Sequence, residues 1–110
     1  MSGNRSISEL KFHNNATTIA EGEVCSVVSD ASTLSIDFMG TGVFTSVVEC
    51  KSSYESDWDE IMAVDAKTYD MSTTPNNFNT WIVDIVGVSY LRVRITSITG
   101  SVSAIGRLVG

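Results

Sequence analysis

The sequence predicts an all-β fold: a single antiparallel two-sheet β-sandwich or jelly roll of about eight strands with an N-terminal arm. Two observations lead to this prediction. Val, Ile and Thr together supply 33 of the 110 residues, and these β-branched side chains favour strands over helices. Turn-forming residues recur roughly every 8 to 12 positions, which is typical of a sandwich. We divide the chain into an arm or edge strand over residues 1–15 and a sandwich domain over residues 16–110.

The first part of the chain contains short candidate strands. Ile7, Leu10 and Phe12 alternate weakly with polar residues, which indicates the arm or edge strand. The pattern then becomes more regular, and strands are expected over residues 17–20 and 23–29.

The central part gives the first clear alternation. Residues 33–39 place apolar side chains on one face and polar ones on the other, as in a strand with one solvated side. The Gly40-Thr41-Gly42 segment is predicted to reverse the chain, because glycine readily adopts the positive φ of a tight turn. Residues 43–51 form the next strand. A further strand over 58–64 is favoured over a helix spanning 56–67, because this segment lacks a continuous helical stripe of apolar residues.

The last part closes the sandwich. Residues 65–79 contain the only proline and are predicted to form a long loop with a short strand near 69–71. Strands follow over 80–86 and 89–98, and the second of these has the clearest alternation in the chain. A turn at Thr99-Gly100 then leads to a final strand over 101–109.

Charge and hydropathy exclude two classes of partner. The chain has 7 Lys+Arg against 13 Asp+Glu, a net charge of −6, whereas nucleic-acid binding needs clustered positive charge. We therefore expect no nucleic-acid partner. No apolar run approaches the roughly 18 to 20 residues that span a bilayer, and the first residues lack the apolar core of a signal peptide. We expect a soluble chain with no membrane partner that is not secreted by the usual route.

The reactive residue types do not form a recognisable site. Cys25 and Cys50 are predicted to be buried free thiols, and a bridge between them requires neighbouring strands and an oxidising environment. The single histidine, His13, is expected to be exposed. Nucleophile, metal and phosphate-loop motifs are absent from the sequence, so we predict no enzyme activity, cofactor or metal. A solvated loop is favoured over a weak calcium site for one acidic cluster: Glu55, Asp57, Asp59 and Glu60.

The aromatic residues allow two interpretations. The strand patterns around Trp58 and Trp81 favour core positions for both side chains. Alternatively, the candidate contacts for sugar rings are Tyr54, Trp58, Tyr69 and Tyr90. In that case the chain would be a carbohydrate-binding adhesion module that recognises a host surface glycan.

Arg92 and Arg94 share the solvated face of one predicted strand in a chain that has few positive charges. One interpretation is a cross-strand ion pair with Asp37 or Asp84, which contributes only some tenths of a kcal/mol at a surface. The other is that the two arginines dock onto an acidic neighbouring subunit, where desolvation strengthens the interaction.

Several segments resemble the β-sandwich modules of virion proteins from tailed phages and prophages. The resemblance covers roughly residues 30–110 and rests on a G-x-G-x-F turn, an Asp-Trp pair and a closing hairpin. These features correspond here to Gly40, Gly42 and Phe44, to Asp57 and Trp58, and to residues 83–87, 91–97 and Gly100. The chain lacks the glycine that the pattern places after the aspartate.

The resemblance implies a non-enzymatic phage virion structural protein, such as a capsid decoration, neck, tail or fibre-associated subunit. It would be located in the virion after assembly in the host cytoplasm. Its partners would be other virion proteins and copies of itself, which implies a homo-oligomer in the particle. The residues expected at these contacts are Ile7, Leu10, Phe12, Arg92 and Arg94.

Overall fold

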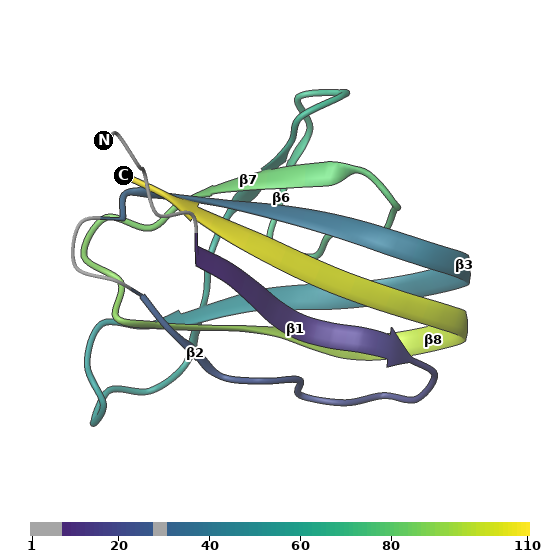
Figure 1. Cartoon of the computed structure of the whole chain (residues 1–110), viewed down its shortest axis with the longest axis horizontal. Coiled ribbons are helices and arrows are strands. Elements are labelled where there is room, and N and C mark those ends of the chain that lie inside the picture. The colour runs from purple at the N-terminus through teal and green to yellow at the C-terminus, as the bar shows by residue number, and fades with distance from the viewer. Residues whose placement is uncertain (1–7, 28–30) are drawn as a thin grey trace.

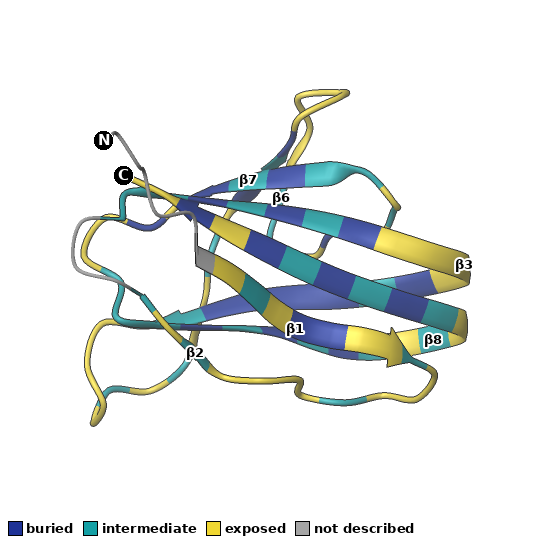
Figure 2. Ribbon diagram, viewed as in Figure 1, coloured by how far each residue is buried: buried dark blue, intermediate teal, exposed yellow. Residues whose placement is uncertain are grey.

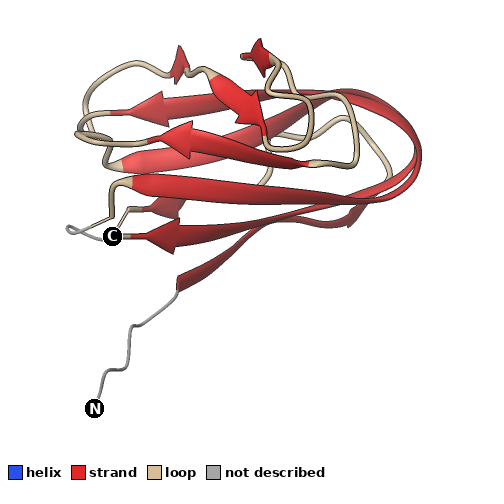
Figure 3. Cartoon of the chain, turned by 90° about the horizontal axis from the view of Figure 1, so that it is seen from above, coloured by secondary structure: helices blue, strands red, loops and turns tan. Residues whose placement is uncertain are grey.

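The computed structural model describes residues 8–27 and 31–110, and this part of the chain contains eight strands and no helix (Figure 3). It therefore contains no helix that could cross a membrane. The all-β prediction is confirmed. The segment 58–64 is not helical, but the single strand predicted there is two short strands, Asp59–Glu60 and Ala63–Asp65. The strands are β1 (Ser8–Ala16), β2 (Cys25–Ser26), β3 (Thr33–Lys51), β4 (Asp59–Glu60), β5 (Ala63–Asp65), β6 (Met71–Ser72), β7 (Thr80–Asp84) and β8 (Tyr90–Val109).

A ribbon of two long strands organises the molecule. β3 has 19 residues and β8 has 20, and they pair antiparallel from Thr33↔Val109 to Lys51↔Tyr90. Both strands curve round at the same end of the molecule, so that the ribbon folds back on itself (Figure 1). The first half of β3 and the second half of β8 lie in one layer, with the order β1-β8-β3-β7-β5-β6. The other halves form a second layer, in which β2 pairs with β8 and β4 pairs with β3.

The predicted turns at Gly40-Thr41-Gly42 and Thr99-Gly100 are wrong, because both strands continue through these segments. The glycines instead bend the ribbon. Gly42 and Gly100 lie directly opposite each other and have φ values of 86° and 95°. A Cβ atom added to Gly42 would lie 1.9 Å from the carbonyl oxygen of Thr99. The two backbones approach each other so closely here that only glycine fits.

The core lies between the two layers. Alternate residues of the first half of β3, of β7 and of much of β8 are buried, as the banding of these strands in Figure 2 shows. This period of two is the alternation predicted for residues 33–39 and 89–98. In the second half of β3, after a register shift at Thr45/Ser46, residues 46–49 are all buried. Trp81 is 3% exposed, so its predicted core position is confirmed. The largest fully buried side chains are Phe12, Phe38, Phe44, Leu34, Ile36, Ile85, Leu91 and Ile95.

β1 lies at one edge of the first layer and pairs with β8. Phe12 is 1% exposed and belongs to the core, so its expected role as a contact for a neighbouring subunit is not available to it. Leu10 is half-buried against the same core, and Ile7 lies outside the described residues. The expected exposure of His13 is wrong, because its side chain is buried. The pairing register shifts on both sides of His13, and such an irregularity lets two consecutive side chains face inward.

The His13 side chain joins the two layers. Its Nε2 atom lies 2.5 Å from the backbone oxygen of Val93, which belongs to the half of β8 in the second layer. The edge strand β1 is thereby fixed to both layers.

Cys25 and Cys50 are free thiols on opposite sides of β8, since each is paired in register with Leu91. They are separated by two interstrand spacings, about 10 Å, which is beyond the reach of a disulfide. The strands that carry them are therefore not neighbours, as a bridge would require. Burial raises the pKa of both thiols, with smaller contributions from Glu23 at Cys25 and from Asp59 at Cys50.

A buried carboxylate holds the long loop that follows β5. The carboxylate oxygens of Asp65 accept hydrogen bonds from Nδ2 of Asn79 at 2.9 Å and Nδ2 of Asn77 at 3.1 Å. They also accept from the backbone N–H groups of Lys67 and Thr68. One side chain therefore fixes both ends of the loop.

These hydrogen bonds favour the charged form of Asp65. The bond from Asn79 contributes most, and the group's pKa is lowered to about 2 although burial acts in the opposite direction. Asn77 also accepts a hydrogen bond from the indole N–H of Trp81 at 3.0 Å. The loop is in this way connected to the core.

We expect Gly42→Ala to destabilise the protein by about 4 kcal/mol, because it combines a positive φ with a backbone clash. Gly87→Ala is the matched control. Gly87 has a φ of 83° but nothing within 4 Å of its Cβ position, so only the conformational cost of about 1 to 2 kcal/mol remains. Urea unfolding of the two variants measures the difference. Equal losses of stability would show that the ribbon does not need the close approach at Gly42.

Acidification tests the role of Asp65. Because its pKa in the folded protein is lowered to about 2, its contribution is complete above the ordinary value of about 4 and is lost as the pH falls through about 2. Asp65→Asn should lower stability at neutral pH and reduce the further loss between about pH 4 and 2. Asp57→Asn, at an exposed loop position, is the control. Unfolding midpoints of Asp65→Asn that run parallel to those of the wild type across this range would contradict the prediction.

Candidate functional site

A hollow of about 210 Å³ lies where the ribbon strands end, remote from the glycine bend. Lys51 is the last residue of β3, and Tyr90 is the first residue of β8. Tyr54 and Trp58 belong to the segment between β3 and β4, and Val24 precedes β2. These five residues line the hollow, which we call the aromatic hollow.

The aromatic rings in this hollow have defined contacts. The rings of Tyr54 and Tyr90 meet edge to face, with centroids 6.3 Å apart and an interplanar angle of 66°. The guanidinium carbon of Arg92 lies 4.2 Å from the centroid of the Trp58 ring, and Nζ of Lys51 lies 4.9 Å from the same point. These are cation–π distances. Trp58 therefore forms a wall of the hollow that two cations hold in place.

The predicted core position of Trp58 is wrong, because this residue is only partly buried. Residues 52–58 leave the ribbon as a loop before β4 begins, so the ring packs on charged side chains at the layer surface rather than between the layers. Tyr54 on the same loop is 80% exposed.

Arg92 and Arg94 form an ion-pair cluster with Glu49. Nε of Arg92 lies 2.8 Å from Oε1 of Glu49, and Nε of Arg94 lies 3.2 Å from the same oxygen. Nη1 of Arg92 also reaches the carboxylate of Glu21 at 3.4 Å. Glu49 is directly opposite Arg92 in the β3–β8 register, so the cluster lies across the ribbon in the second layer.

The predicted pairing of these arginines with Asp37 or Asp84 is wrong. Asp37 lies in the first half of β3, and Asp84 lies in β7, so both belong to the first layer. The bend places Arg92 and Arg94 in the second layer. Asp37 instead accepts a hydrogen bond from the hydroxyl of Thr80.

The cluster is electrostatically satisfied. Burial would by itself raise the pKa of Glu49, but hydrogen bonds from Arg94 and Arg92 lower it below the ordinary value. The same contact with Glu49 raises the pKa of Arg94. Glu49 and Arg94 are therefore held in their charged forms, and charge-assisted hydrogen bonds hold the cluster together beside the aromatic hollow.

The other candidate residues lie apart. Tyr69 belongs to the β5–β6 hairpin in the first layer and is 78% exposed, so the structure does not bring it to Tyr54 and Trp58. Within residues 8–27 and 31–110, no three His, Cys, Asp or Glu side chains form a group that could hold a metal ion. The acidic cluster is exposed to solvent: Glu55, Asp57, Asp59 and Glu60.

Tyr90, a candidate sugar contact from the sequence, also lines the aromatic hollow. Lys51 and Val24 complete the lining but were not among the residues predicted to form a site. Their sequence signals are weak, because each belongs to a different strand end or loop. Only the pairing of β2 and β3 with β8 brings them together.

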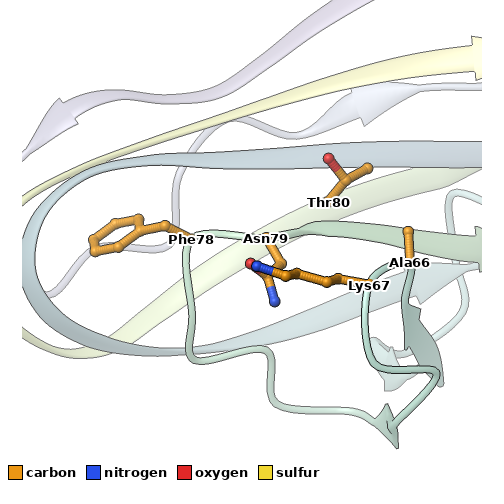
Figure 4. Close-up of a pocket in the computed structure, with 5 residues that line it drawn as sticks. All are labelled: Ala66, Lys67, Phe78, Asn79 and Thr80. Atoms are coloured by element: carbon orange, nitrogen blue, oxygen red, sulfur yellow. The ribbon is translucent and has the colours of Figure 1, made fainter.

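A second hollow, of about 360 Å³, lies in the first layer and is lined by Ala66, Lys67, Phe78, Asn79 and Thr80. Figure 4 shows the side chain of Lys67 extending toward Asn79. The amide of Asn79 donates to Asp65 and the hydroxyl of Thr80 donates to Asp37. These polar groups serve the fold, so we assign this hollow a structural role.

Comparisons with known proteins agree with this architecture. The model of the XepA family matches residues 6–108. The structure of the SPBc2 prophage-derived protein YomS has a TM-score of 0.87 at 20% identity and covers 96% of this chain and 94% of YomS. The structure of the PBSX exported protein XepA has a TM-score of 0.89 at 25% identity. The match covers 100% of this chain and 40% of XepA.

No curated protein sequence matches the chain. The family model nevertheless spans nearly the whole chain, and the two similar structures are a prophage-derived protein and a PBSX protein. The predicted resemblance to a phage-associated β-rich module is thereby confirmed. The chain belongs to the XepA family.

Proposed function

We propose that this chain is a non-enzymatic structural protein of a phage virion that acts through protein–protein contacts. Membership of the XepA family and the similarity to two phage-related structures support this role. The finer assignment is a capsid decoration, neck, tail or fibre-associated subunit that assembles with other virion proteins and copies of itself.

The observation that carries this proposal is an apolar sheet edge. β6 ends the strand order of the first layer. On the outer face, Met71 is paired in register with Val64, and Val64 with Ile82. Met71 is 66% exposed and Met62, one residue before β5, is 47% exposed. Exposed apolar side chains grouped at the end of a sheet favour contact with another chain. We call the following four residues the edge patch: Met62, Val64, Met71 and Ile82.

The edge patch replaces the contact residues expected from the sequence. Phe12 is buried, and Leu10 packs partly against the core. Arg92 and Arg94 already pair with Glu49, so docking on an acidic neighbour would first have to break an internal ion pair. The edge patch carries no such cost.

A second candidate function is adhesion to a host surface glycan. The grouping of Tyr54, Trp58 and Tyr90 around one hollow favours it, because pockets that bind sugars combine aromatic walls with a few polar groups. The two functions use different layers of the molecule and do not exclude each other.

Incorporation into particles tests the structural role. We expect a tagged chain, expressed during growth of the phage that encodes it, to co-sediment with purified particles. Met71→Asp should reduce its incorporation at least about tenfold, because it places a charge at the centre of an apolar contact. Val86→Asp is the matched control, since Val86 is 73% exposed but lies outside the edge patch.

Thermal unfolding checks that both variants remain folded. Absence of the wild-type chain from the particles would contradict the structural role. Equal incorporation of the two variants would contradict the assignment of the edge patch.

A further inference from the structure

The lining of the aromatic hollow is positively charged in an acidic protein. The whole chain carries a net charge of −6, yet its five lining residues include one lysine and no acid. In the described part of the chain, every salt bridge involves Arg92 or Arg94, and the Lys51 ammonium makes none. Lys51 is therefore the charged group in the hollow that is available to a ligand.

No acidic side chain lines the hollow beside Lys51. The cluster beside the hollow contains two arginines, and their partners are two carboxylates, Glu49 and Glu21. This set is balanced within itself. Five further acids on the flanking segments are exposed, where solvent and salt screen their fields, and none of them lines the hollow: Glu23, Glu55, Asp57, Asp59 and Glu60. Lys51 is therefore the one charged side chain that lines the hollow, and its ammonium can pair with one carboxylate.

The aromatic walls define the rest of the ligand. Tyr54 is 80% exposed, and its edge-to-face contact with Tyr90 orients its ring without stacking on it. A sugar ring fits such a surface, because its C–H groups are weakly positive and the aromatic face is negative. The volume of about 210 Å³ is below the range of roughly 300–1,000 Å³ for drug-sized ligands. It suits a single ring.

We propose that the aromatic hollow binds one acidic pyranose unit of a glycan, a uronic acid residue. Its ring packs on Tyr54, and its carboxylate pairs with Lys51. Trp58 closes the side wall, held there by Arg92 and Lys51. This inference rests on the second candidate function, glycan adhesion, and names its ligand class. It is independent of the structural role in the virion.

Matched sugar pairs test the inference. The probes are methyl glycosides of the gluco, galacto and manno series, each as the neutral hexose and as its uronate. Binding to the full chain is followed by tryptophan fluorescence, which reports on Trp58 in the hollow, whereas Trp81 is buried. We expect at least one uronate to bind about tenfold more tightly than its neutral partner, and added salt to remove this preference.

Variants separate the charge from the stacking surface. Lys51→Gln should equalise the affinities for the uronate and its neutral partner, and Lys51→Arg should retain the difference. Tyr54→Ala should abolish binding of both sugars. Tyr69→Ala is the matched control, because Tyr69 is 78% exposed but lies on the β5–β6 hairpin away from the hollow. It should bind like the wild type.

The outcomes distinguish the two hypotheses. Equal binding of neutral and acidic sugars by the wild type overturns the uronate assignment and leaves glycan adhesion in place. No binding of any pair overturns both the uronate assignment and the adhesion function. A preference for uronate that survives Lys51→Gln also overturns the proposal, since it places the carboxylate elsewhere.

Discussion

The pairing of β3 with β8 through the glycine bend is the constraint on which the other strands depend. β1 and β2 attach to β8, and β4 and β7 attach to β3, so that only β5 and β6 are held indirectly. One continuous ribbon crosses between the layers. The close approach at Gly42 and Gly100 fixes where it bends, and with it which residues face each other across the core. A side chain at the bend would separate the two backbones and weaken both layers at once.

The same bend decides the electrostatics of the surface. The second half of β3 and the first half of β8 carry Glu49, Arg92 and Arg94 into the second layer, where they form an ion-pair cluster that Glu21 completes. The aspartates of the first layer are instead used in hydrogen bonds, most completely at Asp65. Glu49, Arg92 and Arg94 therefore form an ion-pair cluster in the second layer. In the first layer, Asp65 holds a loop in place through hydrogen bonds.

The two proposed contact surfaces belong to different layers. The edge patch lies at the end of the first layer, beside β6. The aromatic hollow lies at the ends of the ribbon strands in the second layer. A chain held in a particle through the edge patch would keep the aromatic hollow available to a ligand. Assembly and glycan recognition are thus physically compatible in one small domain.

The sequence by itself determined the all-β class and which side chains face inward over residues 33–39 and 89–98, because the period of two is a local property of the strand. It also located the glycines. Only the tertiary structure decided that these glycines bend a continuous two-stranded ribbon instead of forming a tight turn between two strands. This outcome depends on the partner strand, which lies about sixty residues away in the sequence.

The same distinction explains the burial of His13, the partial exposure of Trp58 and the choice of Glu49 as the partner of Arg92. Each depends on contacts between segments distant in the sequence, and no local pattern records such contacts.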